Sequence, residues 1–234
     1  MSGRLGSVGE FCWLDLKTRD VEATSAFLSR TLGWEFTAGR LGERPMTLIS
    51  TGGHRIGGVS DLANPVYPPG IPPHVAYYLA VDDVGACAKE AIAYGATMVV
   101  EPCDVGEQGR LATLVDPVGA AFSLWRPKEF RGWTFPPGTP AAPARMVVAC
   151  AEPGRAGEFY ERMLGAPFTS AVFTEADEPE PRWEAAVAVA GAHGPAARVV
   201  TPEGMGFPVA VQQRRGDDRR MPAAPRSPSR HERA

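Results

Sequence analysis

Residues 72–127 constrain the fold more than any other stretch, because their pattern predicts one strand, one helix and three further strands in succession. The segment reads PPHVAYYLAVDDVGACAKEAIAYGATMVVEPCDVGEQGRLATLVDPVGAAFSLWRP. Side chains alternate between apolar and mixed types over 74–81, which is typical of a strand with one buried face. Tyr77 and Leu79 would face a core, while His74, Ala76 and Tyr78 would face the other way.

Capping and turn residues mark the ends of the helix and of the last two strands in this segment. Asp83 is a suitable N-cap, an apolar stripe follows at helical spacing, and Gly95 suits the left-handed position that ends a helix. The turn DPVG at 116–119 has the residues that a tight turn prefers, and it separates strands predicted at 110–115 and 120–125. With a strand at 97–100, the order is β-α-β-β-β.

The same order is repeated earlier in the chain. Asp20 and Gly33 would cap a helix there, at displacements of 63 and 62 residues from Asp83 and Gly95. Strands are predicted from Phe11 and at 34–37, 46–50 and 55–60. Matching cap residues at nearly equal displacements indicate an internal repeat of a supersecondary unit. The two units span 8–62 and 72–127.

This pattern resembles one module of the vicinal oxygen chelate superfamily, on VDDV at 81–84, Gly95, the DPVG turn and FSLW at 122–125. The superfamily includes glyoxalase I, extradiol dioxygenases, and fosfomycin- and bleomycin-resistance proteins. The resemblance implies an α+β fold in which paired β-α-β-β-β modules curve around a shared cavity. It implies no particular activity, because this scaffold supports many.

The rest of the chain is predicted to have three parts. Residues 128–144 are rich in proline and read as a linker. Residues 145–201 are predicted to be a third, unpaired module, because FYERMLGAPF at 159–168 repeats features of FLSRTLGWEF at 27–36. Residues 202–234 form an Arg/Pro-rich tail whose last 23 residues lack the apolar surface needed for folding, so disorder is expected. A basic arm, or a C-terminus altered by truncation or frameshift, stays open as an alternative.

Composition narrows the class of protein. Apolar residues make up 44% and charged residues 22%, as in soluble globular proteins. The formal net charge of −3 gives no reason to expect nucleic acid as a partner, and no stretch is apolar enough for a membrane span. The four cysteines show no C-x-x-C spacing, and the N-terminus lacks a signal-peptide core. A cytoplasmic location is therefore expected.

The resemblance also implies where metal ligands would stand in the metal-dependent members. Those positions hold Trp13, Ala76 and Ser123, together with Gly57, and none is a plausible ligand for a divalent cation. No metal and no other cofactor is therefore predicted; if a cofactor exists, it is a divalent metal. His54 and His74 with Asp15 remain an alternative ligand set.

The cavity face is instead expected to be apolar and aromatic. The predicted pocket residues are Trp13, Asp15, His74, Ala76, Tyr78, Ser123 and Trp125. Such a lining suits a small hydrophobic or aromatic ligand held without a metal, as in the bleomycin-resistance branch. The alternatives are a superfamily enzyme with displaced ligands (a lyase, an isomerase or a dioxygenase or hydroxylase) and a scaffold with a closed cavity. The sequence leaves open whether a reaction is catalysed, and homodimerisation is possible through the third module.

Overall fold

The computed structural model describes residues 4–41, 44–189 and 198–211. Its larger sheet has eight strands in the order β2-β3-β4-β1-β5-β8-β7-β6. These strands are β1 (Phe11–Thr18), β2 (Glu35–Leu41), β3 (Arg44–Thr51), β4 (His54–Asp61), β5 (His74–Ala80), β6 (Thr97–Val105), β7 (Gly109–Val115) and β8 (Ala121–Pro127). Antiparallel β1 and β5 join the two halves, and each pairs in parallel with the last strand of its own half. The predicted α+β fold of paired modules is confirmed.

Each half carries one helix between its first and second strands, and the predicted caps are present. The helices are α1 (Val21–Leu32) and α2 (Val84–Ala93). Asp20 and Asp83 each accept a hydrogen bond at the start of a helix, from the backbone N–H groups of Ala23 and Ala86. Gly95 follows α2 with φ +97, a conformation that side chains other than glycine rarely adopt. Among the described helices, none combines the length and apolar character needed to cross a bilayer.

A second sheet of five strands follows, in the order β10-β9-β11-β13-β12. Its elements are β9 (Pro143–Cys150), α3 (Pro153–Leu164), β10 (Ala171–Glu175), β11 (Trp183–Val189), β12 (Arg198–Val200) and β13 (Gly206–Val211). The strands predicted within 145–201 are present, but their order is not that of a β-α-β-β-β module. The start of the predicted tail at 202 is wrong, because β13 lies in it. The disorder predicted for 212–234 falls outside the described residues.

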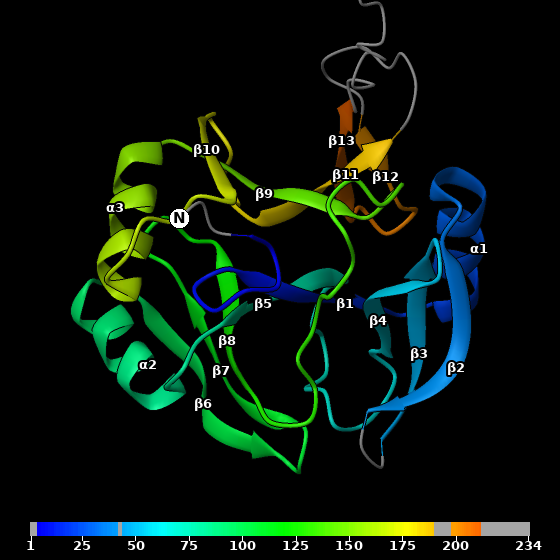
Figure 1. Cartoon of the computed structure of the whole chain (residues 1–234), viewed down its shortest axis with the longest axis horizontal. Helices are drawn as coiled ribbons and strands as arrows, with labels where there is room; N and C mark the ends of the chain where they lie inside the picture. The colour runs from blue at the N-terminus through cyan, green and yellow to red at the C-terminus, as the bar shows by residue number, and fades with distance from the viewer. Residues whose placement is uncertain (1–3, 42–43, 190–197, 212–234) are drawn as a thin grey trace, which may run out of the picture.

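The second sheet packs against the face of β1 and β5 that carries Phe11 and Tyr77, and α2 and α3 lie side by side (Figure 1). Aromatic rings carry this contact: the ring centroids of Phe11 and Trp183 are 4.8 Å apart. The buried Tyr77 hydroxyl accepts a hydrogen bond from the Ala185 backbone N–H at 2.9 Å. The linker adds Trp133, whose indole N–H donates to the Ile56 carbonyl at 2.7 Å. The C-terminal region therefore docks onto the modules of its own chain.

Candidate functional site

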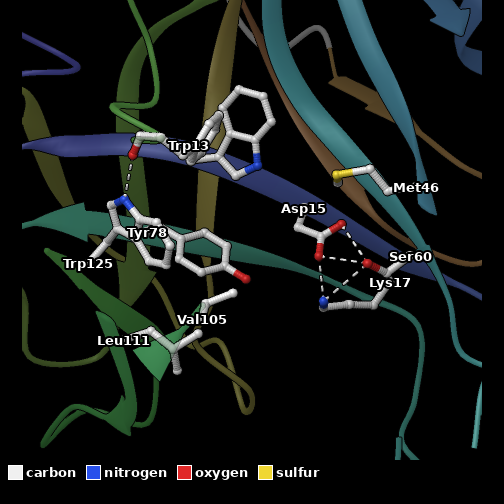
Figure 2. Close-up of a pocket in the computed structure, with 10 residues that line it drawn as sticks. Trp13, Asp15, Lys17, Met46, Ser60, Tyr78, Val105, Leu111 and Trp125 are labelled. Atoms are coloured by element: carbon white, nitrogen blue, oxygen red, sulfur yellow. Dashed lines mark hydrogen bonds and ion pairs between the residues drawn. The ribbon is translucent and has the colours of Figure 1, made fainter. Parts of the chain in front are cut away.

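A cavity of about 120 Å³ lies on the concave face of the eight-stranded sheet, between its two halves (Figure 2). Both halves contribute side chains, and one more comes from the segment after β8. The lining residues are Trp13, Asp15, Lys17, Met46, Ser60, Tyr78, Val105, Leu111, Trp125 and Phe130. The pairing of β1 with β5 brings the two halves together at this point, because it places Trp13 opposite Tyr78.

One wall of the cavity is aromatic. The rings of Trp13 and Phe130 meet edge to face with centroids 4.7 Å apart, and Tyr78 and Trp125 meet in the same way at 6.1 Å. The Trp125 indole N–H donates to the Phe130 carbonyl at 3.0 Å, which fixes the segment after β8 against the wall. Gly109 makes room for this indole, since an added Cβ would lie 2.4 Å from the Trp125 ring. The wall therefore presents ring edges and faces to the cavity.

The opposite wall carries a buried ion pair. Lys17 donates to the carboxylate of Asp15, and Ser60 Oγ donates to Asp15 Oδ2 at 2.8 Å and lies 3.1 Å from Oδ1. Lys17 Nζ also lies 3.4 Å from Ser60 Oγ and 3.0 Å from the Tyr67 hydroxyl. The Lys17 and Asp15 side chains are only 11% and 8% exposed, so water screens the pair little. Asp15, Lys17 and Ser60 are called the polar trio below.

The environment keeps Lys17 charged. Burial lowers its pKa, but the charge of Asp15 and the neighbouring Tyr78 and Tyr67 hydroxyls outweigh burial and raise the pKa above its ordinary value. The ammonium also lies 4.9 Å from the ring centroid of Tyr67, a distance at which a cation is attracted to a ring face. The polar trio therefore holds a fixed positive and a fixed negative charge beside the aromatic wall.

The structure brings four of the seven predicted pocket residues to the cavity wall: Trp13, Asp15, Tyr78 and Trp125. The other three share their sheet face but do not line the cavity. His74 is exposed, with its Nδ1 2.8 Å from the Pro72 carbonyl, and Ala76 pairs with Asp15 across β1 and β5. Ser123 is buried, and its hydroxyl lies 2.8 Å from that of Thr113. The ligand-binding role of all seven stays a prediction.

Six lining residues were not predicted: Lys17, Met46, Ser60, Val105, Leu111 and Phe130. A signal existed for Lys17, because it follows Trp13 and Asp15 at the spacing of two that places side chains on one strand face. Ser60 could have been inferred only from the parallel pairing of β1 with β4, which sets it opposite Lys17. Phe130 reaches the cavity because the chain turns back after β8. No local sequence pattern predicts that turn.

The residues at the superfamily's metal positions do not fit a divalent cation. Trp13 and Ala76 have no suitable donor atom, and Ser123 is the only hydroxyl among them. Gly57 faces away from the cavity, since an added Cβ would lie 2.5 Å from a methyl group of the buried Leu14. Over residues 4–41, 44–189 and 198–211, no three His, Cys, Asp or Glu side chains are grouped to hold a metal, and His54 joins no such group. Metal independence itself stays a prediction.

The thiols of Cys12, which is buried, and Cys87, which is half-buried, are poor nucleophiles. Cys12 is fully buried, and burial raises the pKa of its thiol to about 12. Burial raises the pKa of Cys87 to about 11, and the acidic neighbours Asp83 and Glu90 contribute to that rise. Both thiols therefore stay protonated near neutral pH, where only the thiolate would attack an electrophile. The cavity's chemistry rests on its aromatic wall and the polar trio.

Comparison with known proteins agrees with this architecture. The glyoxalase-like domain family matches residues 13–125. The Mycobacterium tuberculosis protein named "Putative glyoxylase CFP32" is 28% identical over 160 residues, which make up 68% of this chain and 60% of that protein. The "Anthracycline biosynthesis protein DnrV" of Streptomyces peucetius is 30% identical over 168 residues, 67% of this chain and 61% of that protein. The chain thus spans about three fifths of the length of these relatives.

A solved structure shows the same fold at low sequence identity. The Mn(II)-bound glyoxalase from Novosphingobium aromaticivorans superposes with a TM-score of 0.58 and 14% identity, over 87% of this chain and 82% of that one. That glyoxalase binds Mn(II), whereas in the present chain Trp13, Ala76 and Ser123 stand where the superfamily resemblance places metal ligands. Residues 13–125 belong to the glyoxalase-like domain family, and the paired β-α-β-β-β modules give the chain the fold of the vicinal oxygen chelate superfamily.

Proposed function

We propose that the chain binds a small hydrophobic or aromatic molecule in the cavity of the eight-stranded sheet, and that it does so without a metal. The observation that carries this proposal is the aromatic wall facing the polar trio across one cavity (Figure 2). Trp13, Tyr78 and Trp125 offer ring surfaces, and aromatic pairs gain stability beyond the area that they bury. The polar trio supplies the few placed polar groups that orient a ligand in such pockets.

The size of the cavity limits the ligand. Its volume of about 120 Å³ is close to that of an engineered apolar cavity of roughly 150 Å³ that accepts benzene. One substituted ring therefore fits best, and larger ring systems would need the wall to move. The name of the Streptomyces peucetius relative links that protein to anthracycline biosynthesis, and anthracyclines are aromatic compounds. This link supports an aromatic ligand class for the present chain.

Titration of the whole protein with p-cresol tests the proposal. Trp13 and Trp125 line the cavity, so a bound ring should change the tryptophan fluorescence in a saturable way, and calorimetry should give one site per chain. Trp125→Phe should reduce the fluorescence change, whereas Trp34→Phe, a buried tryptophan outside the cavity, should keep it. Treatment with EDTA should leave the affinity unchanged. Absence of saturable binding, or binding that appears only after Mn²⁺, Fe²⁺ or Zn²⁺ is added, would overturn the proposal.

A superfamily enzyme is the second candidate, because the polar trio places a carboxylate and an ammonium beside the ligand space. Such a pair could exchange a proton with a bound molecule. One relative is named as a glyoxylase, so the hemithioacetal of methylglyoxal and glutathione is a suitable first substrate. Turnover that survives EDTA and disappears in Asp15→Asn would favour the enzyme over the binding protein.

A further inference from the structure

We propose that the polar trio makes the cavity selective for uncharged ligands that carry a hydroxyl group on the ring, in preference to ring acids, ring ammonium ions and plain hydrocarbons. This inference rests on the proposed function and names the ligand class of the same site. It depends on the two charges of the trio being neutralised by each other inside the protein. Asp15 and Lys17 form a direct ion pair, and both are buried.

The hydrogen-bonding capacity of the trio matches a hydroxyl group. The Asp15 carboxylate only accepts hydrogen bonds, and the Lys17 ammonium only donates them. A hydroxyl group can do both, so one ligand oxygen can donate to Asp15 while it accepts from Lys17. The longest contact of Lys17 is that with Ser60 at 3.4 Å, and it is the one that a ligand oxygen can replace at least cost. A hydrocarbon ring makes neither hydrogen bond.

The same neutrality disfavours charged ligands. A ring carboxylate would gain attraction from Lys17, but it would meet the like charge of Asp15 next to it and leave the site with a net negative charge. A ring ammonium would meet Lys17 in the same way. Burying an uncompensated charge is costly, because the cavity walls replace water with few dipoles. Both ions should therefore bind more weakly than the neutral hydroxyl compound.

The surrounding tyrosines support this polar end of the cavity. Figure 2 shows the Tyr78 side chain extending from the aromatic wall toward the polar trio. Lys17 Nζ donates a hydrogen bond to the Tyr67 hydroxyl at 3.0 Å, and Tyr67 belongs to the segment between β4 and β5. Lys17 is thus fixed by three oxygen atoms from separate parts of the chain, so its position is set before a ligand arrives.

A matched set of four ligands tests the selectivity. Toluene, p-cresol, p-toluate and 4-methylbenzylammonium share one ring and one methyl group, and differ only in the polar substituent. At pH 7 the phenol is neutral, and the other two substituents are charged. Calorimetry on the full chain should give p-cresol an affinity about tenfold or more above that of toluene, and the two ions should bind more weakly than p-cresol.

Variants of the trio should change this ranking in opposite directions. Asp15→Asn leaves the Lys17 charge without a partner, so p-toluate should gain at least about tenfold relative to p-cresol. Lys17→Met leaves the Asp15 charge, so the ammonium ligand should gain instead. Breaking a buried pair can destabilise a protein, so the double variant Asp15→Asn/Lys17→Met, which keeps the site neutral, is included. In the double variant, p-cresol should lose most of its advantage over toluene. Lys89→Met, on the exposed side of α2, is the control and should keep the ranking.

The outcomes separate this inference from the proposed function. If none of the four compounds binds the wild-type protein, the proposed function fails. If toluene and p-cresol bind equally, the cavity binds rings but the trio does not select among them, and this inference alone is wrong. An unchanged ranking in the double variant would also overturn it. Circular dichroism of each variant identifies any that has not folded, and the double variant then decides the question.

Discussion

The two sheets of the molecule share a four-strand centre but differ in what surrounds it. In the larger sheet, antiparallel β1 and β5 are flanked by β4 and β8, which run parallel to them. In the smaller sheet, antiparallel β9 and β11 are flanked in the same way by β10 and β13. Within the described residues, the larger sheet adds two further strands on each side, whereas the smaller adds only β12. The smaller sheet thus has the centre of a module pair without most of its outer strands.

This difference explains where the cavity is found. Met46 of β3, Leu111 of β7 and Val105 of β6 belong to the outer strands of the larger sheet, and all three line the cavity. Over 143–189 and 198–211 the smaller sheet has one such strand, β12, and its central strands pack against the larger sheet. The superposition with the Novosphingobium glyoxalase spans 87% of the chain, more than residues 8–127 alone could account for, so the common fold includes the smaller sheet. The outer strands of the larger sheet therefore line the cavity that we propose as a ligand site, and the smaller sheet covers the opposite face of β1 and β5.

The largest effect of a substitution on stability is expected where the two sheets meet. Trp183 is almost fully buried and contacts the rings of Phe11, Tyr160 and Phe168. Trp183→Ala would leave a cavity in this cluster, and we expect a loss of about 3–5 kcal/mol in the free energy of unfolding. Urea denaturation followed by circular dichroism measures it. Trp183→Phe keeps most of the ring contact and should cost much less. A loss below about 1 kcal/mol in Trp183→Ala would show that the smaller sheet is not a structural cover.

The second largest effect is a pH dependence of the free energy of unfolding, and it arises at the same contact between the two sheets. Asp116, in the turn before β8, is buried and accepts hydrogen bonds from the Tyr160 hydroxyl at 3.0 Å and from the Ala120 N–H at 2.8 Å. Burial raises the pKa of Asp116 above its ordinary value, although these hydrogen bonds oppose the shift. A raised pKa means that the folded state holds this proton to higher pH than the unfolded chain does. Its contribution is complete below the unfolded pKa and is lost as pH rises through the folded pKa.

Comparison with Asp116→Asn isolates that contribution. As pH rises from 3.5 to 7, wild type should lose stability relative to the variant, by roughly 1.4 kcal/mol for each unit by which the pKa is raised. Urea midpoints at several pH values give the difference. Asp104→Asn, at an exposed carboxylate, is the control and should not remove the wild-type trend. If wild type instead gains stability over this window relative to Asp116→Asn, the assigned direction of the shift is wrong.

Much of the fold could be predicted because local chemistry sets it. Asp20 and Asp83 cap helices, Gly33 and Gly95 take left-handed conformations after them, and these signals follow from backbone geometry alone. The order of the smaller sheet could not be predicted in this way. Strand pairing there depends on long-range contacts, such as that between Tyr77 and Ala185, which no local pattern encodes.

Part of the candidate site could likewise be predicted from the sequence, and part of it could not. Alternation along β1 placed Trp13 and Asp15 on one face and put Lys17 beside them, so that the ion pair was implicit in the pattern. The two other partners of Lys17 could be identified only from the three-dimensional structure. Ser60 comes from a parallel strand, and Tyr67 comes from the segment between the modules. Residue type alone also could not show that Ala76 and His74 lie outside the cavity wall.

The smallest effect on stability is expected at the cavity wall itself. Leu111 of β7 lines the cavity, so part of its side chain already faces space not filled by protein. Leu111→Ala removes fewer packing contacts than truncation of a fully enclosed leucine would, and we expect a cost below about 1 kcal/mol. Leu124 of the adjacent strand β8 lies on the opposite sheet face and is fully buried, which makes it the matched control. Leu124→Ala should cost about 2–5 kcal/mol in the same urea assay.

For ligand affinity, the order of the two effects should be reversed: the substitution at Leu111 should matter more than the one at Leu124. Leu111→Ala widens the cavity and removes contact with a bound ring, so the affinity for p-cresol should fall several-fold while the fold stays intact. Leu124→Ala, measured well below its melting temperature, should bind p-cresol nearly as wild type does, because its side chain does not reach the cavity. Equal stability costs at the two positions would mean that Leu111 is packed as a core residue in solution. The cavity on the concave face of the larger sheet would then be closed.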